Sequence, residues 1–256
     1  MVSVRRRQFL ISGALLLVTG VLVVAAPPLF AQTAKPVRIG WLGFGIPATA
    51  AVSQEIFRQG MDSLGYIDGT QYVLESRLAE GRIDRLPALA AELVQLPVDI
   101  ILALGTLSAL AAKKVTSTIP IVMVGVGDPV GSGLVKSLSR PGGNITGMSD
   151  LLPDLSAKTI ELFVEGVPKL TKVAVMVNEA NPVSVPVMKD IVAAARKVGL
   201  DTSVVRATTV DEIERGFSAA THKKVGAIIL AADILFLIYR DKIAELAVKQ
   251  DRKSVV

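Results

Sequence analysis

The chain has 256 residues, of which 51% are hydrophobic and only 4% aromatic, so aliphatic side chains must form its core, as in parallel α/β proteins. Its 28 basic and 23 acidic residues give a net charge of +5, or +2 (25 minus 23) without the first 31 residues. The sequence has no basic run with interleaved aromatic residues, so nucleic-acid binding is not expected. The absence of cysteine excludes disulfides, thiolate metal sites and cysteine nucleophiles, and a single histidine is too few for most zinc sites.

The N-terminus is typical of an export signal. Three arginines at residues 5–7 precede an apolar run over residues 9–26, and prolines and small residues follow it as far as Ala31. We predict that residues 1–31 are a twin-arginine-like signal peptide cleaved after Ala31, with cleavage after Ala34 or ordinary Sec export as alternatives. An uncleaved membrane anchor is the competing interpretation, because about 18 apolar residues are the lower limit for crossing a bilayer.

Strand and helix patterns alternate from residue 37 onwards. Short apolar runs bounded by glycine or proline predict strands, and apolar residues at helical spacing predict helices. In the first half we expect strands at 37–42, 72–78, 98–104, 120–126 and 145–148, and helices at 49–64, 84–95, 105–114 and 134–138. Gly65 is expected to end the first of these helices, and Asp84 to cap the second.

The same rhythm restarts after Asp150. We expect helices at residues 155–167, 185–198, 211–222 and 234–250, and strands at 172–177, 201–206 and 225–230. Asp211 is expected to cap the third of these helices and Gly199 to end the second. The charged residues 250–256 are not expected to form a strand. The second half then has only three clear strands, so we expect that the chain is truncated or that its natural end has been replaced.

This alternation predicts an α/β protein with parallel sheets and right-handed crossovers. The break between the two series predicts two lobes, an N-terminal one over residues 35–148 and a C-terminal one over residues 149–256, with a cleft between them. In open α/β sheets, ligands bind outside the carboxyl ends of the strands. The loops that leave the predicted strands are therefore the candidate site.

Three such loops lie in the first half. The turn that contains Gly43 and Gly45 resembles a dinucleotide fingerprint, although glycines there also suit a tight strand-to-helix turn. Gly105 and Thr106 open a helix, where free N–H groups can bind an anion, unless Thr106 simply caps that helix. Asp128 follows a buried strand, and its carboxylate can pair with a ligand ammonium or cap the next helix.

Two polar residues follow strands of the second half. Asn178 and Asp233 would face the cleft if the lobes oppose each other, and helix capping is the alternative for both. His222 is expected at the exposed end of a helix, away from any Ser-His-Asp arrangement. Close carboxylate pairs at strand ends are absent, so the sequence offers little support for catalysis.

One stretch of the chain resembles a known family. Residues 118–122, Asp128 with Pro129 and Val130, and residues 141–147 are similar to the signature of a group of exported solute-binding proteins. These proteins serve ABC importers, and the group includes aromatic-amino-acid-type members. Weaker matches at residues 60–69 and 100–106 extend the resemblance to about residues 35–250.

The resemblance implies a type I periplasmic-binding-protein fold, in which two Rossmann-like lobes close on a small ligand about hinge strands. It implies no cofactor, no catalysis, a periplasmic location and an ABC transporter permease as partner, with membrane contact only through the export signal or the permease. The implied ligand is an amino acid or a related small organic acid. The ligand contacts carried over are Phe44, Gly45, Gly105, Thr106, Asp128, Asn178 and Asp233.

Family members continue beyond this chain's last residue, so the second lobe is expected to be incomplete. Three other interpretations stay open. The chain can be the ligand-sensing domain of a signalling receptor, a nucleotide-dependent enzyme that uses Gly43 and Gly45, or a non-functional gene fragment.

Overall fold

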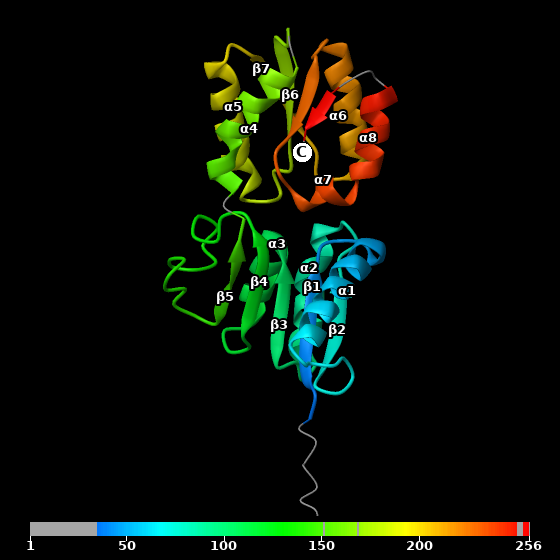
Figure 1. The fold of residues 1–256 in the computed structure, drawn as a ribbon, viewed down its shortest axis with the longest axis vertical. Coiled ribbons are helices and arrows are strands. Elements are labelled where there is room, and N and C mark those ends of the chain that lie inside the picture. The colour runs from blue at the N-terminus through cyan, green and yellow to red at the C-terminus, as the bar shows by residue number, and fades with distance from the viewer. Residues whose placement is uncertain (1–34, 151, 168, 250–252, 256) are drawn as a thin grey trace, which may run out of the picture. The chain divides into compact units, whose positions relative to one another are not determined.

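The computed structural model describes residues 35–150, 152–167, 169–249 and 253–255. The signal peptide predicted for residues 1–31 lies outside these residues. The described residues form two parallel sheets with helices packed against them, which confirms the predicted α/β class (Figure 1).

The first sheet has five parallel strands in the order β2-β1-β3-β4-β5. Its strands are β1 (Val37–Gly43), β2 (Tyr72–Leu78), β3 (Ile100–Leu104), β4 (Ile121–Val126) and β5 (Ile145–Ser149). The helical segments between them are α1 (Pro47–Ser63), the short 3-10 helix η1 (Ile83–Arg85), α2 (Leu86–Gln95) and α3 (Gly105–Val115). The carboxyl ends of its parallel strands therefore share one edge, as the candidate site requires.

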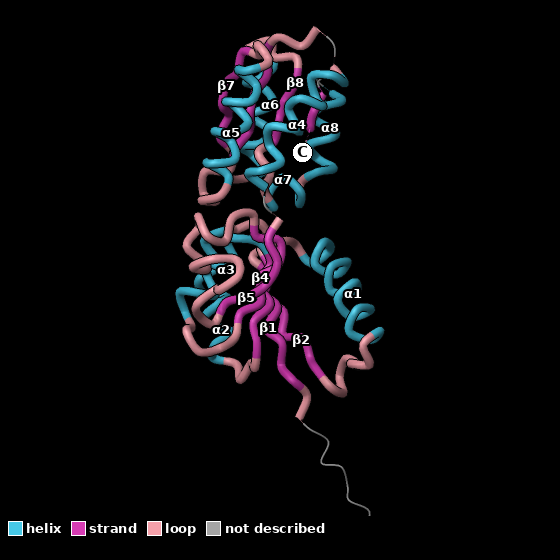
Figure 2. The backbone as a smooth tube through the Cα atoms, turned by 60° about the vertical axis from the view of Figure 1, so that its left-hand side comes forward, coloured by secondary structure: helices cyan, strands magenta, loops and turns pink. Residues whose placement is uncertain are grey.

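The two faces of this sheet are covered unequally. Helices α2 and α3 lie on one side and α1 alone lies on the other (Figure 2). On the α2 and α3 side, helix α2 buries Leu86, Leu89, Ala90 and Leu93. By contrast, Ala50 is the only buried residue of α1. A parallel sheet normally has both faces buried, so the face under α1 is only partly covered by the described residues.

The second sheet has four parallel strands in the order β7-β6-β8-β9. The strands are β6 (Lys172–Val177), β7 (Asp201–Arg206), β8 (Ala227–Leu230) and β9 (Lys253–Val255). Its helices are α4 (Leu152–Gly166), α5 (Ser184–Lys197), α6 (Val210–His222), α7 (Ile234–Ile238) and α8 (Arg240–Lys249). Helices α4 and α5 cover one face, and α6 and α8 cover the other (Figure 1).

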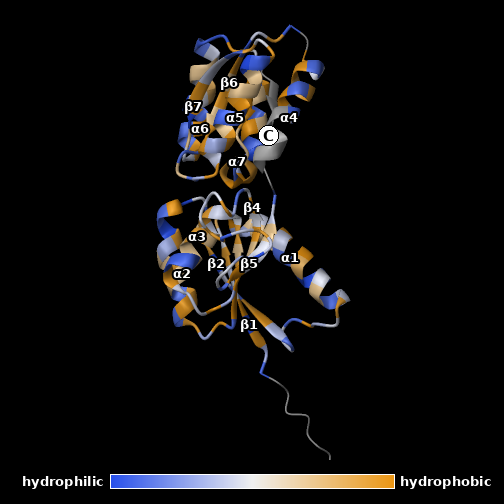
Figure 3. Ribbon diagram, turned by 90° about the vertical axis from the view of Figure 1, so that its left-hand side faces the viewer, coloured by the Kyte–Doolittle hydropathy of each residue, from blue (hydrophilic) through white to orange (hydrophobic). Residues whose placement is uncertain are grey.

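Burial on both faces explains the composition of the central strand β6. Every residue of β6 after Lys172 is buried, and its side chains alternate between the two cores. Such a strand must be apolar throughout rather than alternating. Figure 3 shows the same contrast between largely hydrophobic strands and helices whose exposed faces are hydrophilic.

Glycine positions predicted the helix ends well. Gly65 and Gly199 both adopt a left-handed backbone, with φ of +83° and +79°, and each follows the C-cap residue of its helix, α1 or α5. The N–H groups of Gly199 and Leu200 then donate to carbonyls of the last helical turn. These contacts confirm both glycines as C-terminal caps.

The N-terminal caps predicted for α2 and α6 were wrong. Asp84 forms an ion pair with Arg82 at 2.8 Å, and α2 begins two residues later without a side-chain cap. Thr209, not Asp211, caps α6 by accepting a hydrogen bond from the Glu212 N–H at 3.3 Å. Several side chains near the start of a helix can accept a hydrogen bond from its first N–H groups. The backbone geometry therefore decides which of these side chains caps the helix.

Residues 134–138 do not form the predicted helix. They belong to a series of turns, in which the Leu134 N–H donates to the Pro129 carbonyl and the Lys136 N–H to the Pro141 carbonyl. Leu134 and Val135 are nevertheless buried. The apolar residues in this segment therefore reflect anchoring of a loop rather than a helical face.

The last segment also differs from the prediction. The single helix expected over residues 234–250 is divided at Tyr239 into α7 and α8. The predicted absence of a strand after residue 250 was wrong, because β9 pairs in parallel with β8 and raises the second sheet from three strands to four. The open edge of β8, rather than the propensity of the segment, accounts for this pairing.

Candidate functional site

The loop after β1 is held rigidly at the carboxyl edge of the first sheet. Phe44 is only 1% exposed. The carbonyls of Phe44 and Gly45 accept hydrogen bonds from the N–H groups of Gly81 and Glu80, at 2.8 and 3.1 Å, in the loop after β2. Two adjacent strand exits are therefore fixed to each other.

A cavity of about 390 Å³ opens beside this loop, a volume that suits a small organic ligand. Phe44 and Gly45, both predicted as ligand contacts, lie in its wall. Its other lining residues are Trp41, Gly43, Ile46, Ala48, Thr49, Ala50, Val52, Ser53, Leu78 and Leu104, with Ile234, Leu237, Ile238, Arg240 and Asp241 from α7 and α8. The wall is mainly apolar with a few polar groups, as in many ligand sites.

The floor of the cavity is formed by three neighbouring strands. Gly43 pairs with Leu78 on one side and with Leu104 on the other, and all three residues line the cavity. A Cβ atom at Gly43 would lie 3.0 Å from the Leu78 side chain and 3.7 Å from Trp41 Nε1. The glycine at this position therefore keeps the space between α1 and the sheet open.

Helix α1 points its N-terminus at the cavity. Ile46 provides no side-chain cap, the helix starts at Pro47, and its first turn contains no acidic residue. The first N–H groups of a helix have no intrahelical acceptor and carry a partial positive charge. They can therefore receive an anionic group such as a carboxylate.

The predicted contacts on α3 lie next to this cavity but are not among its lining residues. Leu104 lines the cavity, and Gly105, with φ of +78°, begins α3 directly after it. No side chain caps α3, so the alternative role of Thr106 as a cap was wrong. Thr106 is 5% exposed, and Ser108 is fully buried with no hydrogen-bond partner for its Oγ among the described residues.

Asp128 is engaged within its own loop. Its Oδ1 accepts a hydrogen bond from the Gly131 N–H at 2.7 Å, and its carbonyl accepts one from the Ser132 hydroxyl. The carboxylate thus stabilises a turn rather than capping a helix, which was one of the two roles considered for it, and Asp128 does not line the cavity. Its Oδ2 is not engaged in any of these bonds.

In the second lobe, Asn178 and Asp233 lie together in a polar cluster. The Asp233 carboxylate accepts hydrogen bonds from Asn178 Nδ2 at 3.1 Å, Asn181 Nδ2 at 2.7 Å and Ser184 Oγ at 2.9 Å. It also caps α7 by accepting from the Leu235 N–H at 2.8 Å. The predicted capping alternative for Asp233 is therefore confirmed, and the carboxylate holds three chain segments together.

Sequence reasoning missed several residues of these two groups. Asn181 and Ser184 follow the exit of β6 closely, and a dense set of polar residues after a buried strand would have indicated them. Trp41 shares a face of β1 with Gly43, because residues two apart in a strand point the same way. That spacing is the available signal for Trp41; Thr49 and Ser53 on α1 carry no comparable one.

The groups whose pKa is clearly shifted lie away from the cavity wall. Burial raises the pKa of Tyr72, hydrogen bonds from Thr208 lower that of Glu212, and Arg82 lowers that of Asp84. The described residues also contain no group of three or more potential metal-ligating side chains. None of their helices has the length and apolar character needed to cross a membrane.

Two parallel α/β sheets, with a mainly apolar cavity at the carboxyl edge of one of them, are the architecture of a type I periplasmic-binding-protein fold. Comparison with protein families agrees with this class. The family model for ABC transporter substrate binding proteins matches residues 47–244, and the chain belongs to this family.

Individual relatives extend the comparison. The chain is 33% identical over 185 residues to a protein of Clostridioides difficile named tyrosine-binding protein; the match covers 71% of this chain and 50% of the relative. The chain thus spans about half the length of that relative. Two solved structures share the fold at 24% identity, each over 86% of this chain and 73% of the other. They are a conserved domain protein of Vibrio cholerae, with a TM-score of 0.79, and an ABC domain from Streptococcus pneumonia in complex with L-Trp, with a TM-score of 0.77.

Proposed function

We propose that this protein captures an amino acid or a related small organic acid and delivers it to an ABC importer. The observation that carries the proposal is the cavity of about 390 Å³ beside the loop after β1. It combines an apolar wall, contributed by Phe44 and its neighbours, with the uncapped N-terminus of α1. A ligand with one carboxylate and one apolar group matches both features.

The predicted contact residues take distinct roles in this proposal. Phe44 and Gly45 contact the ligand directly, and the N-termini of α1 and α3 attract its carboxylate, the latter through Gly105 and Thr106. Asp128 offers Oδ2 to a ligand ammonium group. Asn178 and Asp233 provide the second wall, where their hydrogen bonds hold the exit loops of β6 and β8 in position.

The ligand class is narrowed by the relatives. The Clostridioides difficile relative is named for tyrosine, and the Streptococcus pneumonia structure contains L-Trp. We infer that aromatic amino acids are the first ligands to test. We also propose that the mature protein acts outside the cytoplasm after export through residues 1–31, and that the loaded form docks on a membrane permease.

Isothermal titration of the mature protein tests the proposal. The titration would use the aromatic amino acids, the branched-chain amino acids and small organic acids. We expect saturable binding of at least one aromatic amino acid. The proposal fails if the folded protein binds none of these compounds.

A pair of glycine variants locates the site. A Cβ atom at Gly45 would lie 2.8 Å from Thr49 Oγ1 in the cavity wall, whereas a Cβ atom at Gly60, near the end of α1, meets no other atom within 4 Å. Gly45→Val is expected to weaken binding at least roughly ten-fold, because it narrows the cavity. The matched Gly60→Val should bind as the wild type does. Equal affinities of the two variants would place the ligand elsewhere.

A further inference from the structure

The indole N–H of Trp41 is a buried donor without an acceptor. Trp41 is 2% exposed and lines the cavity, and its Nε1 has no hydrogen-bond partner among the described residues. Buried tryptophan N–H groups usually find a partner, because leaving a buried donor unpaired costs about 1–3 kcal/mol. The arrangement therefore calls for an acceptor that enters the cavity.

The indole ring is held in place by aromatic packing. Trp41 contacts Phe57 of α1 edge-on, with 5.8 Å between the ring centroids, and Phe57 makes the same kind of contact with Tyr72 at 5.9 Å. This row of three rings fixes the direction of the N–H bond. Gly43 leaves the space beside Nε1 open, since a side chain there would fill it.

The surroundings determine what kind of acceptor fits. No charged residue of the first lobe lines the cavity, and its floor beside Nε1 consists of Leu78, Gly43 and Leu104. Arg240 and Asp241 also line the cavity, but both are exposed and they pair with each other, with 3.7 Å between Arg240 Nε and Asp241 Oδ1. An anionic group finds its partial positive charge at the N-terminus of α1 rather than among the apolar residues of this floor, so a neutral acceptor is favoured beside Nε1.

The two hydroxyl groups of α1 that line the cavity support this choice. Thr49 Oγ1 donates to the Ile46 carbonyl at 3.0 Å and Ser53 Oγ to the Thr49 carbonyl at 3.4 Å, so both hydroxyl oxygens can still accept. A ligand hydroxyl could therefore accept from Trp41 and donate to one of these oxygens. A ligand that ends in a purely apolar group leaves Nε1 unpaired.

We propose that Trp41 is a specificity-determining residue, whose N–H selects ligands that carry a neutral hydrogen-bond acceptor, such as a hydroxyl, on their apolar part. This inference rests on the proposed function in one respect, which is that amino acids are chosen as the test ligands. It implies that the cavity prefers L-tyrosine to L-phenylalanine, because the two differ only in the hydroxyl group.

The sole tryptophan of the chain makes this testable without assignment. Uniformly ¹⁵N-labelled mature protein gives a single indole N–H signal in a heteronuclear correlation spectrum. We would titrate it with L-tyrosine and L-phenylalanine, and with the fragments p-cresol and toluene, which lack the amino-acid groups. We expect L-tyrosine and p-cresol to move the indole signal downfield until it saturates, because their hydroxyl group accepts a hydrogen bond from the indole N–H. L-phenylalanine and toluene, which have no hydroxyl, should not produce this downfield shift.

Calorimetry on two variants supplies the matched control. Trp41→Phe should weaken L-tyrosine binding roughly five-fold, as expected for one lost hydrogen bond, and change L-phenylalanine binding much less. Tyr72→Phe removes another buried, unpaired polar group on the same sheet face, but Tyr72 does not line the cavity. This variant should keep the wild-type preference.

The outcomes separate this inference from the proposed function. If L-tyrosine binds but the indole signal does not move, the role of Trp41 is refuted and the binding function stands. If p-cresol moves the signal but no amino acid binds, the acceptor site stands and the amino-acid function fails. If neither p-cresol nor any amino acid moves the signal, the inference is overturned.

Discussion

At the scale of single residues, burial and hydrogen bonding divide the polar side chains into two groups. Asp233 is fully engaged, because four donors surround its carboxylate. Trp41, Tyr72 and Ser108 instead contain buried polar atoms that have no partner among the described residues. Groups of the first kind hold the fold together, whereas groups of the second kind reduce its stability unless a ligand satisfies them.

Tyr72 provides the simplest test of this division. Its hydroxyl is buried and unpaired within the described part of the chain, and burial raises its pKa. Tyr72→Phe removes the polar atom and keeps the ring that packs against Phe57. We expect the free energy of unfolding to stay unchanged or rise by up to about 1 kcal/mol in urea denaturation. A loss of more than that amount would mean that the hydroxyl has a partner.

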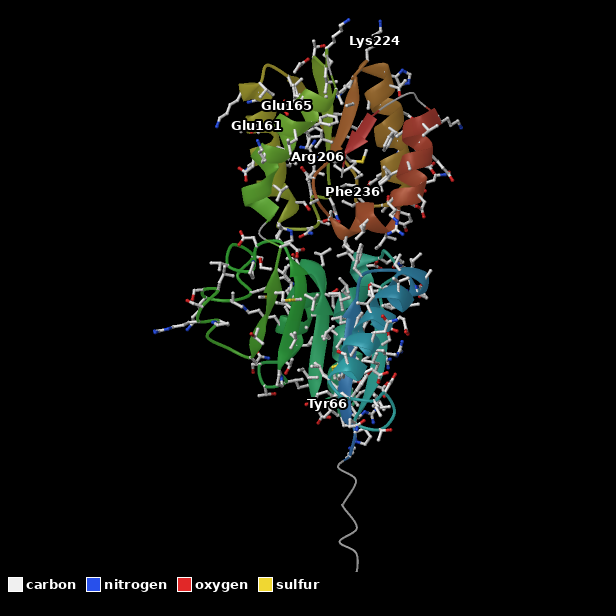
Figure 4. All side chains as sticks on the ribbon, viewed as in Figure 1. Tyr66, Glu161, Glu165, Arg206, Lys224 and Phe236 are labelled. Atoms are coloured by element: carbon white, nitrogen blue, oxygen red, sulfur yellow. The ribbon has the colours of Figure 1, made fainter. Side chains whose placement is uncertain are left out.

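At the scale of elements, the ends of helices and the contacts between strands carry the local stability. Thr209 caps α6, and the Glu212 carboxylate returns to the Thr208 N–H and hydroxyl, both at 2.7 Å. This pairing is a variant of the capping box, in which two side chains satisfy the N–H groups at a helix start. Helix α6 also packs Phe217 against the second sheet, as α7 packs Phe236, labelled in Figure 4.

The cap of α6 can be tested by substitution. Thr209→Ala removes the acceptor for the Glu212 N–H and should lower the free energy of unfolding by about 1 kcal/mol. Asp211→Ala is the matched control, because Asp211 does not provide the cap although its position in the sequence suggested it. Chemical denaturation of both variants measures the difference. A greater loss from the Asp211 variant would contradict the observed cap.

Glu212 also predicts a pH dependence. Hydrogen bonds from Thr208 lower its pKa from the ordinary value of 4.5, so the native state holds the charged form more strongly than the unfolded state does. The resulting stabilisation is complete above pH 4.5 and is lost as the pH falls through the lowered folded-state pKa. Glu212→Gln should therefore lose less stability than the wild type between pH 6 and pH 3. If thermal unfolding shows the same loss of stability for the variant and the wild type as the pH falls, this linkage is refuted.

A glycine within β5, where this strand pairs with β4, should be indispensable for strand pairing. Gly147 has φ of +144°, and a Cβ atom there would overlap the backbone carbonyl of Met123 in the adjacent strand. Gly147→Ala should therefore destabilise the first lobe by about 2 kcal/mol or more. Gly143→Ala is the control, since open space surrounds that position. Thermal unfolding that shows equal midpoints for the two variants would contradict the close approach of the strands.

At the scale of the whole molecule, the unequal covering of the first sheet explains where a ligand can enter. Helices α2 and α3 bury one face, whereas α1 alone lies on the other (Figure 2). The cavity, which Trp41 lines, is on the α1 side. A bound ligand would contribute part of the burial that a second helix layer gives elsewhere. Ligand binding should thus be coupled to global stability.

This coupling gives a measurable shift. A ligand at 100 times its dissociation constant stabilises the native state by about 2.7 kcal/mol. For a chain of this size we expect the unfolding midpoint to rise by roughly 5–10 °C when L-tyrosine is added at that ratio. D-tyrosine at the same concentration is the control. Calorimetric binding without any rise in the midpoint would mean that the ligand binds the unfolded chain equally well.

Much of the architecture followed from periodicity and glycine placement. The predicted bounds of β2, β6 and β7 match the structure, because each is a short strand between clear turn signals. The sequence also placed Phe44 and Gly45 at a strand exit, and both line the cavity, whereas their contact with a ligand stays a prediction. The break at Tyr239 and the strand β9 were not predicted, because both depend on partners distant in the sequence.

The sequence by itself determined the alternation of strands and helices, the parallel sheets and the strand-exit loops that are candidates for ligand binding. These features depend on local apolar periodicity and on backbone angles that glycine permits. Only the tertiary structure decided that Trp41 faces a cavity, that Gly43 keeps it open, and that Asp233 is bound by side chains about 50 residues away. Burial and hydrogen bonding depend on which segments are in contact in the folded chain. The sequence of one segment does not specify the distant segments that it will contact.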